Sequence, residues 1–214
     1  MDKSELLVLY EKKLLEKRCG SPENDPSGPG RTEAEKAENI ALLSELRELI
    51  RENDSKAGAE IREKAYYVMG SLLKNTMEPS CCQFLIDQLK AESDKYILSS
   101  MLTQIQWLHI PDEVDIQPMI ERSQNSAWLI RHSAINALRA SDSDRSREAV
   151  RRWVRQTDEK TYKYELIYAH ASLGFIGMPE DIELLETHTH SRIRDVRDTA
   201  NYAIGNIKAR FGLE

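Results

Sequence analysis

Apolar residues recur at helical spacing along most of the chain. In residues 3–18 and 32–53, leucines and isoleucines follow one another at intervals of about three or four residues, with charged residues between them. This pattern predicts amphipathic helices, each with one face to bury. No segment shows the alternation of apolar and polar residues that predicts a strand. Further helices are predicted at 57–75, 80–91, 95–108, 116–124, 127–140, 144–156, 160–176, 180–189 and 192–210.

Residues that favour helix starts lie between these segments. Pro79 and Pro179 suit a first helical turn, where no backbone N–H is needed. Pro118 either starts its helix late or kinks it. Side-chain caps are predicted at Ser93, Ser126, Asp142, Thr157 and Ser191, together with a capping box from Thr32 to Glu35.

A short motif repeats along the chain, and this is the most informative pattern in it. In its fullest form the motif is Val or Ile, then Arg, two further residues, Ala, three further residues, Leu or Ile, and Gly. Successive copies lie 31 to 36 residues apart, a period that suits one pair of helices per unit. Such units must stack, because none of them buries both its faces alone. The copies start at Ile61, Ile97, Ile130, Glu165 and Val196.

Small residues recur at fixed places in the motif. The fifth position is Ala65, Ala134, Ala169 and Ala200 in four copies and Met101 in the other. A small side chain there allows a neighbouring helix to approach closely. We expect glycines to serve the same purpose five residues later, at Gly70, Gly174 and Gly205.

The chain divides into two parts by composition. Residues 1–56 are predicted to form an N-terminal helical cap, with a flexible loop rich in proline and glycine at 19–31. Residues 57–214 hold the repeats. Because nothing in either part predicts a strand, the predicted fold class is all-α.

The repeated motif resembles that of the HEAT repeat family. The resemblance covers roughly residues 57–210 and includes the segment Pro-Glu-Asp-Ile-Glu-Leu-Leu at 179–185. Two copies lack the arginine and have Leu98 and Leu166 instead. The resemblance implies a right-handed α-α superhelix, an armadillo-type solenoid of about five helical pairs. Its second helices would line a concave surface that binds other macromolecules.

Composition narrows the classes of function. The 214 residues carry a net charge of −6, which disfavours nucleic acid and anionic membranes as partners. No apolar run is long enough to cross a bilayer, and the first residues lack the pattern of a signal peptide. With only three cysteines, no disulfide framework is expected. These features predict a cytoplasmic protein.

Four residues are candidates for contact with a protein partner because of their place in the repeat. They are Arg131, Tyr164, Tyr168 and Arg197. For the arginines, and for the equivalent Arg62, a structural role is the favoured alternative. An arginine at this position would hydrogen-bond the turn between helices or a nearby acidic residue.

A second group of arginines lies on one predicted helix. The four are candidates for binding an anion, although a charged helix face is usually just solvated. They also support an alternative function, in which the 145–155 face binds nucleic acid, as in HEAT-like alkylpurine DNA glycosylases. That alternative lacks an assignable catalytic acid beside Trp107, Trp128 and Trp153, and we expect most aromatic residues to lie in the core. The candidates are Arg147, Arg151, Arg152 and Arg155.

No catalytic or metal-binding motif stands out. Neither His188-x-His190 nor the adjacent Cys81 and Cys82 has partners at a spacing that completes a four-ligand site. We therefore expect no metal and no cofactor. The function predicted from the sequence is a non-catalytic scaffold or adaptor that binds a protein. One version is an inhibitor or immunity protein whose acidic surface covers a basic target.

Overall fold

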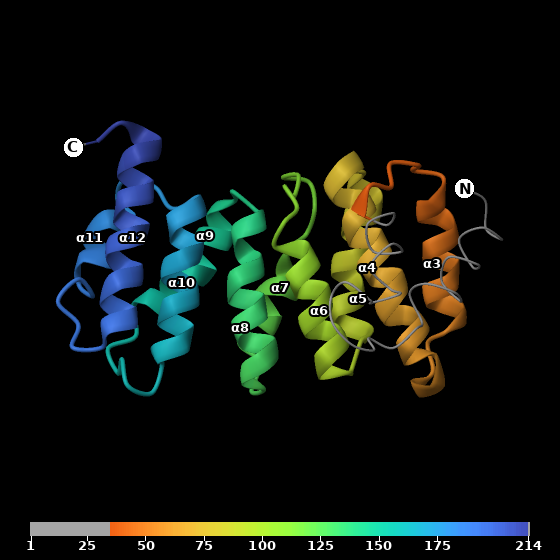
Figure 1. The fold of residues 1–214 in the computed structure, drawn as a ribbon, viewed down its shortest axis with the longest axis horizontal. Helices are drawn as coiled ribbons and strands as arrows, with labels where there is room; N and C mark the ends of the chain where they lie inside the picture. Colours follow the sequence, from red (N-terminus) through yellow and green to blue (C-terminus); the bar gives the residue numbers. More distant parts are fainter. Residues whose placement is uncertain (1–34, 214) are drawn as a thin grey trace, which may run out of the picture. The chain divides into compact units, whose positions relative to one another are not determined.

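The computed structural model describes residues 35–213, and regular structure in that range is entirely helical (Figure 1). The all-α prediction is thus confirmed for these residues, and none of their helices is long and apolar enough to span a membrane. The predicted helix 3–18, the loop 19–31 and Thr32 of the capping box lie outside the described residues. The chain forms two compact units, one ending at His109 and the other starting at Ile110.

In the first unit, the central helix is α4, which packs against α3, α5 and α6. Its buried face carries Ala65, Met69 and Leu72, and Leu46 of α3 and Met101 of α6 are also fully buried. These apolar positions are the ones that the helical spacing predicts. The bounds are α3 Leu42–Glu52, the short 3₁₀ helix η3 Lys56–Gly58, α4 Ala59–Thr76, α5 Pro79–Ala91 and α6 Lys95–Ile105.

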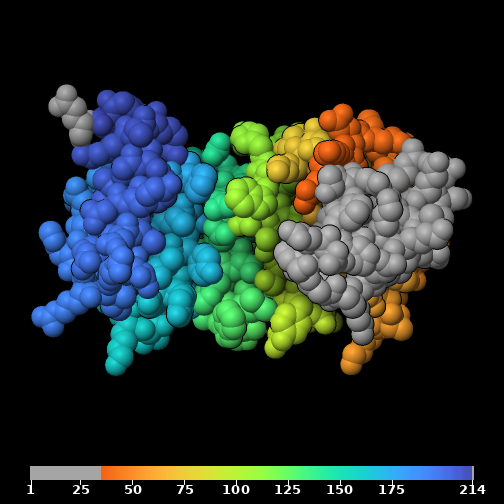
Figure 2. All heavy atoms as spheres, in the orientation of Figure 1, coloured from red at the N-terminus to blue at the C-terminus, as the bar shows by residue number. Residues whose placement is uncertain are grey.

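In the second unit, α10 lies between α8 and α12 (Figure 1). The three shorter helices α7, α9 and α11 pack against α8, α10 and α12 respectively. Side chains of α10 and α12 fill the space between these two ribbons (Figure 2). The bounds are α7 Gln117–Arg122, α8 Trp128–Ala137, the 3₁₀ helix η4 Leu138–Ala140, α9 Asp144–Val154, α10 Lys163–Ile176, α11 Asp181–Glu186 and α12 Arg194–Phe211.

The predicted repeat register matches the helices. Each of the five copies begins at the third residue of a helix, namely α4, α6, α8, α10 and α12. The fifth position of every copy is fully buried. The expectation of close packing at that position is therefore confirmed.

The glycines of the motif differ from one another. A Cβ atom at Gly70 would lie 2.6 Å from Cβ of Gln104, and one at Gly174 would lie 3.3 Å from Cα of Ala203. Both positions bring two helices close together, as expected. At Gly205 nothing lies within 4 Å of such an atom, so the prediction of a close approach there is wrong. Gly205 lies on an exposed part of α12.

Helix starts show where local sequence misleads. Residues 37–39 are not helical, so the predicted helix 32–53 begins only at Leu42. The side chains that cap α6 and α9 are Asp94 and Ser143, one residue after the predicted caps. The residues before α8, α10 and α12 are Ala127, Tyr162 and Ile193, so Ser126, Thr157 and Ser191 are not caps. The hydroxyl of Ser191 instead accepts a hydrogen bond within the turn, from Ile193 N–H.

The prolines behave more nearly as predicted. Pro79 is the first residue of α5. Pro118 is the second residue of α7, so it starts that helix rather than kinking it. Pro179 lies outside α11, which begins at Asp181 and is preceded by Glu180. The prediction of Pro179 in a first helical turn is therefore wrong for this helix.

The boundary predicted at residue 56 lies within the first compact unit and stays a prediction. Helix α3, which the sequence assigns to the cap, packs directly on α4 in the same compact unit. The leucines and isoleucine of α3 that cover α4 are buried. In the structure, α3 is therefore the partner of α4.

The end of α10 is held by a side chain of α12. The guanidinium of Arg210 donates hydrogen bonds to the carbonyl oxygens of Gly174, Phe175 and Gly177. The last carbonyl groups of a helix have no partner within the helix. Arg210 supplies partners that α10 itself lacks.

Candidate functional site

A cleft lined by aromatic side chains lies between α8 and α10. Its volume is about 520 Å³. On each helix the lining residues are spaced three or four apart, which places them on one face. The lining residues are Trp128, Arg131 and His132 of α8, Thr161 of the preceding turn, and Tyr164, Glu165 and Tyr168 of α10.

His132 is the centre of the aromatic group. Its ring centroid lies 5.6 Å from that of Trp128, 5.9 Å from Tyr164 and 5.3 Å from Tyr168. His132 is only 9% exposed, whereas Trp128 is 63% exposed and Tyr164 is 58% exposed. Two large aromatic side chains thus stand in solvent around a nearly buried imidazole.

A buried ion pair forms the polar part of the cleft. Arg131 donates from Nε and Nη2 to Oε1 of Glu165, at 2.8 and 2.5 Å. Burial would raise the pKa of Glu165, but the hydrogen bonds from Arg131 and from the backbone lower it below its usual value. Glu165 is therefore an anion at neutral pH, and its charge is matched by Arg131.

His132 lies beside this ion pair but makes no hydrogen bond to it. Its Nε2 lies 3.1 Å from Oε1 of Glu165, an ion-pair distance. The geometry does not meet that of a hydrogen bond, and the buried Nε2 has no other partner. His132 therefore places a second side-chain nitrogen, besides those of Arg131, beside the carboxylate of Glu165.

Arg131 also has the structural role predicted as the alternative. Its Nη1 donates to the carbonyl oxygens of Asn125 and Ser126 in the turn before α8. Arg62 repeats both contacts, with the carbonyls of Asn53 and Ser55 and with the carboxylate of Glu92. Arg197 repeats the first, with the carbonyl of Ser191. The structural interpretation of these arginines is confirmed.

The structure brings three of the four predicted contact residues together. Arg131, Tyr164 and Tyr168 line the same cleft, and Arg197 lies on α12 outside it. Sequence reasoning did not select Trp128, His132, Glu165 or Thr161. A signal for the first two was present, because Trp128 lies three residues before Arg131 and four before His132, which places it beside both on the helix surface.

The expectation that most aromatic residues lie in the core holds only in part. Trp153 is buried. Trp107, Trp128, Tyr96 and Tyr202 are exposed. Exposed aromatic residues of this size are typical of contact surfaces, where they supply most of the binding energy.

Three of the four predicted anion-binding arginines, in α9 and at its end, are paired with neighbouring acids. Arg147 pairs with Asp144 at 2.6 Å, and Arg155 pairs with Glu148 at 2.7 Å. Arg151 pairs with the buried Asp181 at 2.5 Å. Arg152 is exposed and takes part in none of these three ion pairs. An anion would have to displace three carboxylates, which weakens the predicted anion-binding role.

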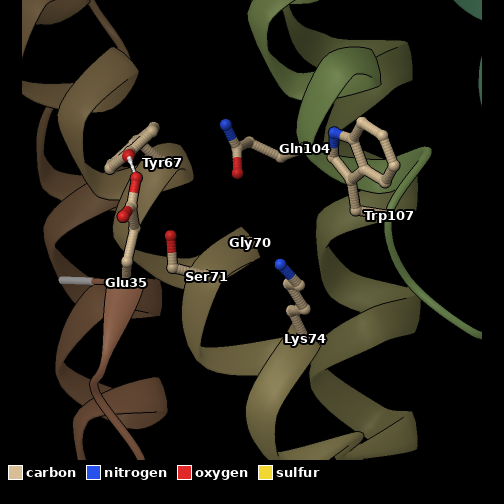
Figure 3. Close-up of a pocket in the computed structure, with 7 residues that line it drawn as sticks. All are labelled: Glu35, Tyr67, Gly70, Ser71, Lys74, Gln104 and Trp107. Carbon is tan, nitrogen blue, oxygen red and sulfur yellow. Dashed lines mark hydrogen bonds between the residues drawn. The ribbon is translucent and has the colours of Figure 1, made fainter. Parts of the chain in front are cut away.

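A second hollow lies in the first unit, between α4 and α6 (Figure 3). Its volume is about 330 Å³. The hydroxyl of Tyr67 donates to Oε1 of Glu35 at 2.7 Å on one wall, and Gln104 and Trp107 form the opposite wall. Gly70 and Ser71 lie on α4 below them, beside Lys74. Most of the side chains that line this hollow are polar, so it is the weaker candidate for an aromatic contact site.

The histidines and cysteines occupy unrelated places. Among residues 35–213, no three His, Cys, Asp or Glu side chains are grouped so that they could hold a metal ion. Cys81 and Cys82 are buried free thiols, and burial raises the pKa of Cys82 to about 12. His188 is buried in a network of its own, whereas His190 is exposed.

The likeness of this chain to known proteins is a likeness of fold at low sequence identity. The sequence matches no protein-family profile and no curated protein. It is similar to a solved structure described as the crystal structure of an engineered protein, from the Northeast Structural Genomics Consortium. The TM-score is 0.51 at 15% sequence identity, over 98% of this chain and 97% of that one. A likeness at this identity concerns the fold and not the function.

Proposed function

We propose that this protein is a non-catalytic adaptor that binds a protein partner through the aromatic cleft. The observation that carries the proposal is the exposure of Trp128 and Tyr164 on either side of a cleft backed by Arg131. Trp, Tyr and Arg are the residues most enriched in the energetic centres of protein interfaces. The cleft offers apolar rings for an inserted side chain and polar atoms that fix its orientation.

The proposal includes a HEAT-like architecture. The helix pairs α3 with α4 through α11 with α12 would continue as a right-handed superhelix. The second helices of the pairs would then share one concave surface, and α8 and α10 would present the cleft on it. The 31 to 36 residue period and the buried fifth position support this arrangement.

A cytoplasmic location and an acidic surface fit the same proposal. The buried thiols of Cys81 and Cys82 are unpaired, as suits a reducing compartment. The net charge of −6 favours a basic target, including the toxin of an inhibitor or immunity pair. The alternative of nucleic-acid binding through the 145–155 face is less well supported, because Arg147, Arg151 and Arg155 are ion-paired.

The test compares three forms of the immobilised protein in lysate of the source organism. They are the wild type, the double variant Trp128→Ala plus Tyr164→Ala, and Tyr202→Ala as a control. Tyr202 is also a solvent-exposed helical aromatic of the second unit, but it lies outside the cleft. Bound proteins are quantified by mass spectrometry, and the affinity of each form for the purified partner is then measured.

The expected result is a partner that binds the wild type and the control equally. The double variant should bind it at least about 30-fold more weakly, since truncating a central aromatic costs about 2 kcal/mol or more. A partner held equally by all three forms would show that the cleft is not the binding site. Salt-dependent binding of DNA, abolished by Arg147→Glu plus Arg151→Glu, would support the alternative instead.

A further inference from the structure

The charges in and beside the aromatic cleft are paired within the protein. Arg131 is matched by Glu165, whose side chain is 4% exposed. Lys163, at the start of α10, lies 2.6 Å from Asp195 of α12, and its ammonium group lies 5.4 Å from the ring centroid of Tyr164. The cleft thus has no net charge to attract an ion of either sign. A charged occupant would lose its hydration there without gaining a partner.

Each of the three large rings of the cleft carries a hydrogen-bond donor. The donors are the indole N–H of Trp128 and the phenol O–H groups of Tyr164 and Tyr168. In the part of the chain that the structure describes, none of these three side chains is hydrogen-bonded to another residue. The carboxylate of Glu165, the strongest acceptor in the lining, is nearly buried and is taken by Arg131. The cleft therefore suits an occupant that brings acceptors and few donors.

A proline-rich peptide segment has this combination of groups. Proline lacks a backbone N–H and keeps its carbonyl group. In the polyproline II conformation the carbonyl groups make no hydrogen bonds within the segment, so they are open to outside donors. A partner helix, in contrast, would present carbonyl groups already bonded to its own N–H groups. A partner strand would bring N–H groups, for which the cleft has neither an open carboxylate nor a sheet edge among the described residues.

The arrangement of the rings also fits an extended segment. Trp128 on α8 is 63% exposed and Tyr164 on α10 is 58% exposed, so both present apolar surface to solvent. The ring of His132 lies between the two helices, with its centroid 5.6 Å from that of Trp128 and 5.9 Å from that of Tyr164. Tyr168 follows Tyr164 by one helical turn, which places a second phenol ring farther along α10. Proline-rich segments dock in grooves lined by aromatic residues in this way.

We propose that the aromatic cleft binds an uncharged, proline-rich segment of the partner protein in the polyproline II conformation. Proline rings pack on Trp128 and Tyr164, and carbonyl groups of the segment accept hydrogen bonds from the indole and phenol groups. Because this conformation is largely formed before binding, little conformational entropy is lost, and a short segment is sufficient. This proposal rests on the proposed function, in which the cleft is a protein-binding site.

The test uses decaproline as the probe, added to the intact protein without any partner. Binding is followed by NMR, through the indole N–H signal of Trp128 and the backbone amide signals of α8 and α10. Three peptides of the same length are compared with it. They are an alternating Gly-Ser peptide, which is neutral and flexible, decalysine, which is cationic, and an alanine-leucine peptide held as a helix by a covalent staple.

The expected result is saturable binding of decaproline, with a dissociation constant of about 1 mM or tighter. The other three peptides should shift the same signals with at least about tenfold weaker affinity. Physiological salt is used throughout, because the net charge of −6 would otherwise attract decalysine to the whole surface.

Variants separate the role of the rings from that of the donors. Tyr164→Phe and Tyr168→Phe keep the ring and remove the O–H group, so each should weaken decaproline binding by about two- to tenfold. Trp128→Ala removes both ring and donor and should abolish measurable binding. The matched control is Tyr202→Phe, the same change at an exposed tyrosine outside the cleft, which should have no effect.

Three results would overturn the proposal. The first is no binding of decaproline at about 1 mM. The second is binding of decalysine or of the helical peptide at the cleft signals as tightly as decaproline. The third is decaproline binding that survives Trp128→Ala, or that is unchanged in both Tyr→Phe variants of the cleft.

Failure of the proposed function looks different from failure of this proposal. If the proposed function is wrong, Trp128→Ala plus Tyr164→Ala leaves capture of the partner intact, whatever decaproline does. If only the proline-rich occupant is wrong, the double variant loses the partner while decaproline fails to bind the wild type.

Discussion

Arg131 places two N–H groups, Nε and Nη2, on a single carboxylate oxygen of Glu165, at 2.8 and 2.5 Å. The two residues lie on different helices, 34 positions apart in the chain. The side chain of Glu165 is 4% exposed, so neither solvent nor salt replaces Arg131 easily. The pair ties α8 to α10 and forms the back of the aromatic cleft at the same time.

Replacing Glu165 with Gln should destabilise the protein by about 3 kcal/mol. The change leaves Arg131 without its counter-charge in a poorly solvated place, and breaking a buried pair is costly. The matched control is Glu148→Gln, which breaks a pair with Arg155 that is about half exposed. Such a pair contributes about 0–1 kcal/mol. Urea unfolding of the two variants should show this difference, and equal small losses would contradict it.

Two glycine substitutions should change the free energy of unfolding in opposite directions. Gly205→Ala should stabilise the protein by up to about 1 kcal/mol, because alanine favours a helix and nothing lies within 4 Å of the new atom. Gly70→Ala should destabilise it, because the new atom would lie 2.6 Å from Cβ of Gln104. Thermal unfolding measures both changes. A loss at Gly205 would mean that α12 has a neighbour there in solution.

Enlarging the fifth position of the motif should overpack it. Ala134→Leu should cost on the order of 1 to 3 kcal/mol, because Ala134 has no exposed surface and the neighbouring helix cannot retreat freely. Ala209→Leu is the control, since Ala209 is exposed on α12. Urea unfolding should separate the two variants by at least about 1 kcal/mol. No loss in Ala134→Leu would show that the repeat register is wrong.

His170 should make stability fall on acidification. Burial, and then the charge of His188, lower its pKa to about 3 from an ordinary value of 6.5. The unfolded chain therefore binds a proton that the folded protein refuses. Stability from this group is complete above pH 6.5 and is lost as the pH falls towards 3. The free energy of unfolding of the wild type and of His170→Gln is measured at several pH values. It should rise more steeply with pH in the wild type than in the variant.

The carboxylates with lowered pKa values change stability at lower pH than His170 does. Their contribution to the pH dependence can therefore be separated from that of His170. Glu92, Glu159 and Glu165 all start from an ordinary value of 4.5. The slope between about pH 6.5 and 5 therefore isolates the histidine contribution. Identical slopes for wild type and His170→Gln in that interval would contradict a neutral His170.

Periodicity predicted the helices and the register, because both follow from which side chains must be buried. Ala65 and Ala134 could be placed in the core from spacing alone. Helix starts could not be placed to the residue, because Ser93 and Asp94 are both good caps and only the path of the turn selects Asp94. The close approach predicted at Gly205 was wrong because the motif does not show that this side of α12 has no neighbouring helix.

The cleft was predicted only in part for a similar reason. Arg131, Tyr164 and Tyr168 were marked by their places in the repeat. Trp128 is one turn from Arg131, but exposure of a tryptophan depends on what packs over it, which spacing does not report. The pairing of Glu165 with Arg131 across 34 residues needs the stacking of two helices, and no local pattern encodes it.

The contact of Arg210 with three carbonyl groups of α10 implies that the two helices open together. When the last turn of α12 opens, Arg210 no longer donates to the carbonyl oxygens of Gly174, Phe175 and Gly177. The end of α10 is then free to fray. Amide hydrogen exchange should accordingly report one shared opening for these two segments. A surface arginine thereby couples the end of α10 to the end of α12.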